Sequence, residues 1–126
     1  MSVQKTATEI INEASVAASA TTALGDCTAV DCSAGIQLVF TVALDFNASA
    51  TAGAEVTLWP SYDGTNYDTA GWSDWAWSIA VDAGNSIQLT SEPISPAVKY
   101  LKIKVENKDS SYAITNLVVN ATKQTA

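Results

Sequence analysis

Apolar and polar residues alternate along much of this 126-residue chain. The longest example is residues 36–46, where every even position carries an apolar side chain and the odd positions mix polar and apolar residues. A period of two residues is typical of a β-strand, and the sparse polarity of the second face indicates a strand in the middle of a sheet. We therefore predict a central strand over residues 36–46.

The same alternation returns in shorter stretches, which cover residues 55–61, 75–81, 86–90, 100–107 and 112–121. The sequence Asp-Ala-Gly-Asn at positions 82–85 predicts a turn that joins residues 75–81 and 86–90 as a hairpin. Two prolines between positions 92 and 97 exclude a central strand there. Residues 122–126 are expected to fray.

Seven or so short strands, with turn residues about every ten positions, predict an all-β protein built as an antiparallel β-sandwich. The pattern fits a jelly-roll and an immunoglobulin-like topology equally. The length suits a single core. We divide the chain into an N-terminal arm or edge strand, residues 1–24, and a single β-sandwich domain, residues 25–126.

Residues 6–24 admit two interpretations. Apolar residues at Ile10, Ile11, Ala14 and nearby alanines can share one face of a helix that ends at Gly25. However, the segment holds six threonines and serines and has no strong helix-forming apolar residue before Leu24. We therefore predict an extended arm or edge strand, which a subunit can lend to a neighbour.

Charge narrows the classes of partner. Charged residues make up 15% of the chain, against roughly 25% in an average soluble domain, which suggests that neighbouring subunits cover part of the surface. The net charge is −7, from 13 acidic residues and 6 lysines, without arginine or histidine. This balance argues against nucleic-acid binding, which needs a basic surface. The lysines at positions 99, 102, 104 and 108 either face solvent or meet an acidic neighbour.

Cys27 and Cys32 are too few for a disulfide scaffold or a four-ligand zinc site. A local disulfide is one interpretation, and we favour reduced, partly buried thiols. The first residues lack the apolar core of a secretory signal, and no apolar run is long enough to cross a bilayer. We expect a protein made in the cytoplasm that does not contact membrane and needs no cofactor.

The stretch from Asp63 to Asp68 follows the strand at 55–61 and has turn chemistry around Gly64. Asp63, Asn66 and Asp68 offer oxygen ligands near calcium-loop spacing, but the closing bidentate glutamate of an EF-hand is missing. We treat them as weak metal candidates and favour a structural turn. No histidine stands beside the serines or cysteines, so the usual nucleophilic arrangements are absent and no catalytic residue is assigned. We predict that the protein is not an enzyme.

Aromatic residues gather around this turn and are candidates for an interface or a ligand platform. They are Trp59, Tyr62, Tyr67, Trp72, Trp75 and Trp77. Rings on a sandwich can stack on sugars, fill the core or anchor a subunit interface. Same-parity spacing places Trp75 and Trp77 on one face with Ile79, which favours core or interface.

The chain resembles small β-sandwich virion proteins of tailed bacteriophages over about residues 30–121. These proteins carry an Asp-Gly-x-Asn-aromatic turn after a strand, and a later Pro-x-x-Lys-Tyr-Leu-Lys strand that ends in Asn and pairs with a final strand. The matching residues here are Asp63, Gly64, Asn66, Tyr67, Pro96, Lys99, Tyr100, Leu101, Lys102 and Asn107. The tryptophan-rich segment 71–77 and the cysteines lie outside the pattern.

The resemblance implies a non-enzymatic virion structural protein, either a capsid decoration (cement) protein or a tail component. Its expected partners are other copies of itself and a capsid or tail protein. One alternative is a carbohydrate-binding or host-adhesion module that uses Tyr62, Tyr67, Trp72 and Trp75 on a surface glycan. Another is a subunit of a self-assembling extracellular filament, joined by donor-strand exchange through residues 1–24.

Overall fold

The structure, a computed structural model, describes residues 3–126 and contains only strands and one short 3-10 turn in that range. The elements in chain order are β1 (Gln4–Val16), η1 (Leu24–Asp26), β2 (Val30–Asp31), β3 (Gly35–Asp45), β4 (Ala54–Ser61), β5 (Ala76–Ile79), β6 (Ser86–Thr90), β7 (Tyr100–Asn107) and β8 (Ile114–Thr125). Across residues 3–126, no helix has the length and apolar character needed to span a bilayer.

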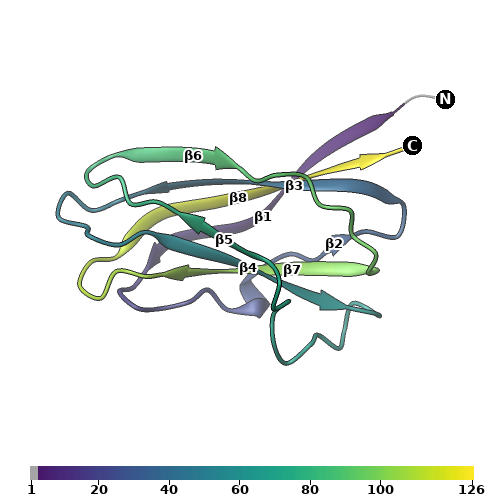
Figure 1. Ribbon diagram of the computed structural model, residues 1–126, viewed down its shortest axis with the longest axis horizontal. Coiled ribbons are helices and arrows are strands. Elements are labelled where there is room, and N and C mark those ends of the chain that lie inside the picture. The colour runs from purple at the N-terminus through teal and green to yellow at the C-terminus, as the bar shows by residue number, and fades with distance from the viewer. Residues whose placement is uncertain (1–2) are drawn as a thin grey trace.

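The strands form two four-stranded antiparallel sheets that pack face to face (Figure 1). Sheet A has the order β1-β8-β3-β6, and sheet B has the order β2-β7-β4-β5. The prediction of an all-β antiparallel sandwich is therefore confirmed.

The pairing of strands is nested. The first strand pairs with the last, β2 with β7, β3 with β6, and β4 with β5. A long two-stranded ribbon that wraps in this way is a jelly roll, so the structure decides between the two topologies that the sequence left open.

The predicted hairpin between residues 75–81 and 86–90 is wrong. β5 pairs with β4 in sheet B, whereas β6 pairs with β3 in sheet A. The turn at residues 82–85 therefore carries the chain from one sheet to the other. Both arrangements bury the same alternating residues, so the local pattern does not distinguish a hairpin from such an arch.

The core is built from the strand positions that alternation predicted. The even positions of β3 from Leu38 to Leu44, and Phe46 directly after the strand, are buried, and along β7 Leu101, Ile103 and Val105 are fully buried. Ile36 is a correction, because its side chain is 45% exposed. It lies at the start of β3, where a register shift between Gly35 and Gln37 interrupts the alternation.

Residues 4–16 are extended and form the edge strand of sheet A, paired with β8. A bulge between Glu9 and Ile11 turns both Ile10 and Ile11 into the core. The expected fraying of the C-terminal tail is wrong for Thr122–Thr125, because β8 continues through these residues between β1 and β3.

Two buried polar side chains hold the loops at one end of the sandwich. Asn107 is fully buried at the end of β7. Its Nδ2 lies 2.9 Å from the Tyr112 carbonyl oxygen, 3.2 Å from that of Val16 and 3.3 Å from that of Ala17. Its Oδ1 accepts the Asp109 N–H at 3.0 Å. One amide therefore satisfies backbone groups that follow β1 and precede β8.

Asp109 extends this network to the loop before β4. Its carboxylate accepts N–H groups of Thr51 at 2.8 Å and Ala52 at 3.3 Å. It also accepts N–H groups of Ser111 at 2.8 Å and Tyr112 at 2.9 Å. These backbone donors lower the pKa of the carboxyl to about 2, because they favour its charged form.

Core burial predicts different effects for the same substitution at two leucines. Leu101→Ala should lower the free energy of unfolding by about 3 kcal/mol, because it leaves a cavity in the core. Leu89→Ala should cost less than about 1 kcal/mol, because Leu89 is 44% exposed on the edge strand β6. Urea unfolding followed by tryptophan fluorescence measures both. Equal losses would contradict the assigned core.

The lowered pKa of Asp109 predicts a pH dependence. The carboxylate stabilises the fold fully above the ordinary value of 3.8, and this contribution is lost as pH falls through about 2. Asp109→Asn should lower the urea midpoint at pH 7 and flatten its decline between pH 4 and pH 2. Asp74→Asn, in an exposed loop, is the control and should follow the wild-type curve. Parallel curves for wild type and Asp109→Asn would refute the role of this carboxylate.

Candidate functional site

The turn after β4 is organised around the Asp63 carboxylate. Its Oδ1 accepts the N–H groups of Thr65 at 2.9 Å and Asn66 at 2.7 Å, and its Oδ2 accepts the Asn66 Nδ2–H at 2.7 Å. Gly64 has a φ of +82°, which favours glycine. The buried Ser61 side chain also bonds this turn, because its Oγ–H donates to the Asn66 carbonyl oxygen at 2.7 Å. The backbone donors of Asn66 and Thr65 hold the pKa of Asp63 well below its usual range.

This geometry occupies the Asp63 oxygens, which were candidates for calcium. Both Asp63 carboxylate oxygens already accept hydrogen bonds, and the Asn66 amide donates to one of them. Within residues 3–126, no group of three or more acidic, cysteine or histidine residues is arranged to hold a metal ion. The interactions found at Asp63, Asn66 and Asp68 are those of a self-contained turn, and their weak assignment as metal ligands stays a prediction.

The outer face of sheet B carries aromatic rings paired with lysines. The Lys104 Nζ lies 3.9 Å from the centre of the Trp59 ring, and the Lys102 Nζ lies 4.9 Å from that of Tyr67. Both distances suit cation–π attraction. Trp59 also donates its Nε1–H to Thr57 Oγ1 at 3.0 Å. We call these four residues, Trp59, Tyr67, Lys102 and Lys104, the aromatic–lysine face.

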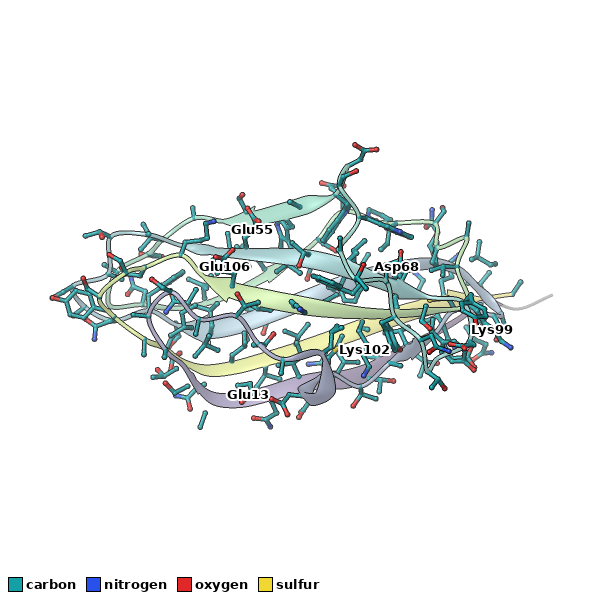
Figure 2. The ribbon with its side chains drawn as sticks, turned by 90° about the horizontal axis from the view of Figure 1, so that it is seen from below. Glu13, Glu55, Asp68, Lys99, Lys102 and Glu106 are labelled. Atoms are coloured by element: carbon teal, nitrogen blue, oxygen red, sulfur yellow. The ribbon has the colours of Figure 1, made fainter. Side chains whose placement is uncertain are left out.

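Acidic and basic side chains lie toward opposite ends of sheet B. Figure 2 shows Glu55 and Glu106 close together on β4 and β7, with Lys99 and Lys102 toward the other end. Glu55 and Glu106 are direct cross-strand partners, and Lys108 forms a salt bridge to Glu106 at 3.4 Å. Covering this end of sheet B would cost the desolvation of these charged groups, so it is a poor packing surface.

The remaining aromatic candidates lie elsewhere. Trp75 and Trp77 are partly buried against the core, with the Trp75 ring 6.5 Å from that of Phe40 in an edge-on arrangement. Tyr62 and Trp72 lie in the loop between β4 and β5 and are 74% and 36% exposed. The six rings therefore divide among the core margin, the outer face of sheet B and the loop, and they do not form one platform.

Cys27 and Cys32 are both buried and free. Burial raises the pKa of Cys27 and raises that of Cys32 to about 11. Since the thiolate is the reactive form, both thiols are poor nucleophiles.

The outer face of sheet A has a different character. Register places side chains of β3, β6 and β8 side by side on it, and none is charged over the middle of the sheet. The members are Val39, Thr41, Ala43, Gln88, Thr90, Val118, Asn120 and Thr122. The Oγ1 atoms of Thr41 and Thr90 lie 2.9 Å apart. We call this set the uncharged face.

The uncharged face was not among the sequence-based candidates. Its signal is the weak polarity of the odd positions of residues 36–46, which predicted only a central strand. These positions form one face with residues of β6 and β8 only through the register of strand pairing, which the sequence does not supply.

No protein-family model and no curated protein matches the sequence. The fold does match solved structures. A chain in the structure of infectious bursal disease virus, Gx strain, superposes with a TM-score of 0.61 at 9% identity. The match covers 98% of this chain and 32% of that chain, so this chain spans about a third of its length. The PRD1 vertex protein P5 matches with a TM-score of 0.50 and 16% identity over 98% of this chain and 95% of P5. At these identities the likeness shows a shared fold.

The Tyr67 hydroxyl gives a test of the aromatic–lysine face. The Tyr67 hydroxyl oxygen is buried, and no atom within residues 3–126 forms a hydrogen bond with it. Tyr67→Phe should therefore leave the free energy of unfolding unchanged or raise it by up to about 1 kcal/mol. Exposed Tyr62 is the control, and Tyr62→Phe should stay within about 0.5 kcal/mol of wild type. A clear loss of stability in Tyr67→Phe would mean that the hydroxyl is satisfied.

Proposed function

We propose that this chain is a non-enzymatic virion structural protein, a capsid decoration or tail component that associates with copies of itself and binds the virion lattice. It is made in the host cytoplasm and acts on the particle. Its binding surface is the uncharged face of sheet A.

The uncharged face is the observation that carries this proposal. The chain has a net charge of −7, yet the eight side chains across the middle of sheet A include no charged group. Depletion of charge at the centre of a patch is typical of protein interfaces. Small threonine, alanine and valine side chains on a sheet also permit close approach, with hydroxyl and amide groups to bond a partner.

The fold is compatible with this role. Jelly rolls occur in viral capsid proteins and also in lectins, so the topology alone leaves both a virion role and sugar binding open. The likeness to a chain of the infectious bursal disease virus structure and to the PRD1 vertex protein P5 supports the virion role. The turn and strand motifs shared with tailed-phage virion proteins point the same way.

The chemistry of the side chains also supports a structural role. The thiols are buried and poorly ionised. The carboxylates of Asp63 and Asp109 are bonded to the backbone of their own loops. The two carboxylates stabilise turns, and neither they nor the thiols are available for acid–base chemistry.

Donor-strand exchange through residues 1–24 is less compatible with the fold. β1 already pairs with β8 of its own chain, and Ile10, Ile11 and Val16 belong to the core. Lending this segment to a neighbour would remove those side chains from the donor's own core.

Glycan binding remains the second candidate, favoured by the exposed rings of Tyr62 and Trp72. A sugar stacked on Trp72 would change tryptophan fluorescence. Titration with a panel of glycans, on wild type and on Trp72→Ala, therefore separates this function from lattice binding.

The test of the virion role measures incorporation into particles. Virions that carry the gene for this chain should contain many copies of it, as quantified by mass spectrometry of purified particles. Thr41→Lys places a charge at the centre of the uncharged face and should reduce the copy number at least tenfold. Ser78→Lys, exposed on sheet B, is the matched control and should be incorporated normally. Absence of the wild-type chain from particles, or equal incorporation of both variants, would refute the proposal.

A further inference from the structure

The N-terminal half of β1 forms an open edge of sheet A. Figure 1 shows the start of β1 and the end of β8 running side by side to the two termini. Residues 4–9 are all exposed. The Ile10 carbonyl accepts the Thr28 N–H at 2.8 Å, and in the described chain no loop donates to or accepts from residues 4–9 on this edge. Open strand edges are templates for pairing with another chain.

The side chains on this edge have a self-complementary order. Lys5, Ala7 and Glu9 share the outer face of sheet A, and they lie opposite uncharged Gln124, Thr122 and Asn120 of β8. Neither Lys5 nor Glu9 forms a salt bridge within residues 3–126. One positive and one negative side chain are therefore held at equal distances on either side of Ala7.

We propose that residues 5–9 of β1 pair antiparallel with the same residues of a second copy, around a twofold axis at Ala7. In this register Lys5 lies opposite Glu9 of the second copy, and Glu9 opposite its Lys5. Thr6 lies opposite Thr8 of the second copy on the inner face. The inference rests on the proposed function, since it supplies the self-association step of a lattice protein.

Charge selects this register. Opposite charges and Thr–Thr pairs directly across two strands are stabilising, and like charges are destabilising. With the twofold axis at Thr6 or at Thr8, Lys5 of each copy has no acidic residue opposite it. An axis at Glu9 places the two Glu9 side chains against each other, and it would require pairing across the bulge between Glu9 and Ile11.

The fold also limits the pairing to these residues and leaves room for it. The Thr28 N–H occupies the Ile10 carbonyl, so the ladder ends after Glu9. Each Ile10 then lies opposite Gln4 of the other copy, and the two Ile10 residues stand about 20 Å apart along the ribbon. The segments of the two β1 strands that follow Glu9 therefore run away from the ladder in opposite directions.

Such a dimer would enlarge the lattice-binding surface. Paired side chains in a sheet point to the same face, so the outer faces of both A sheets would lie on one side of a continuous sheet. The two uncharged faces would then be presented together. A five-residue ladder is a small contact, and it gains strength when both uncharged faces bind one lattice.

A cysteine at the axis tests the register directly. Opposite residues of an antiparallel pair have Cα atoms about 4.5–5.5 Å apart, which is within disulfide range. Ala7→Cys should therefore form a disulfide-linked dimer under mild oxidation, seen by non-reducing electrophoresis. Both native cysteines are buried and should not compete.

Ala14→Cys is the matched control, because Ala14 is exposed on the same strand but lies beyond the proposed ladder. Its covalent dimer should form at least tenfold more slowly than that of Ala7→Cys. Equal rates for the two variants, or no covalent dimer of Ala7→Cys, would overturn the proposal.

Charge exchange tests the same register without a covalent bond. In sedimentation equilibrium, Lys5→Glu should raise the dimer dissociation constant about tenfold, because it creates two like-charge pairs in each dimer. The double variant Lys5→Glu/Glu9→Lys should restore it. Lys5→Glu/Glu13→Lys has the same net charge and should not, because Glu13 lies beyond the bulge. Equal dissociation constants for the two double variants would overturn the register.

The outcomes distinguish this inference from the function on which it rests. If Ala7→Cys fails to cross-link while wild-type chain is found in virions, the strand pairing is wrong and the virion role stands. If Ala7→Cys cross-links but virions lack the chain, the pairing stands and the virion role fails.

Discussion

The pairing of β8 with β1 on one side and β3 on the other is the interaction on which the rest of the structure depends. It joins the last strand of the chain to the first, closes the outermost pair of the nested ribbon and builds most of sheet A. The same pairing brings Val118, Asn120 and Thr122 beside β3 and so creates the uncharged face. It also places β1 at the edge of sheet A, where the edge of residues 4–9 is open.

The two sheets divide the surface chemistry between them. Sheet B carries lysines and opposed glutamates on its outer face, which water solvates strongly, and lysines lie over the aromatic rings there. Sheet A presents small and uncharged side chains, with Lys5, Glu9 and Asp45 confined to its margins. Since water solvates charged groups strongly, covering sheet A costs less desolvation than covering sheet B. This difference gives the molecule one face suited to packing and one suited to solvent.

Loop order in this protein comes from carboxylates and amides that bond the backbone. Asp63 closes the turn after β4, whereas Asn107 and Asp109 join the segments that follow β1, precede β4 and precede β8. A jelly roll has many crossings between sheets, and its loops leave backbone groups without ladder partners. Polar side chains satisfy these groups, from buried positions at Asn107 and Asp109 and from an exposed one at Asp63, which explains why these two acidic residues are structural.

The sequence by itself determined the strands from β3 onward, most of their inward faces and the turn at Asp63, because these depend on neighbours a few residues away. Burial with a period of two positions is visible in Leu38, Phe40 and Val42 without knowledge of their partners. Only the tertiary structure decided which strands pair, since an arch and a hairpin after β5 bury the same side chains. It likewise separated Trp75 and Trp77 at the core margin from Trp59 on the outer face, and it extended β8 through Thr125. The uncharged face and the open edge at Ala7 arise from register between strands distant in the chain, and register is a property of the assembled sheet.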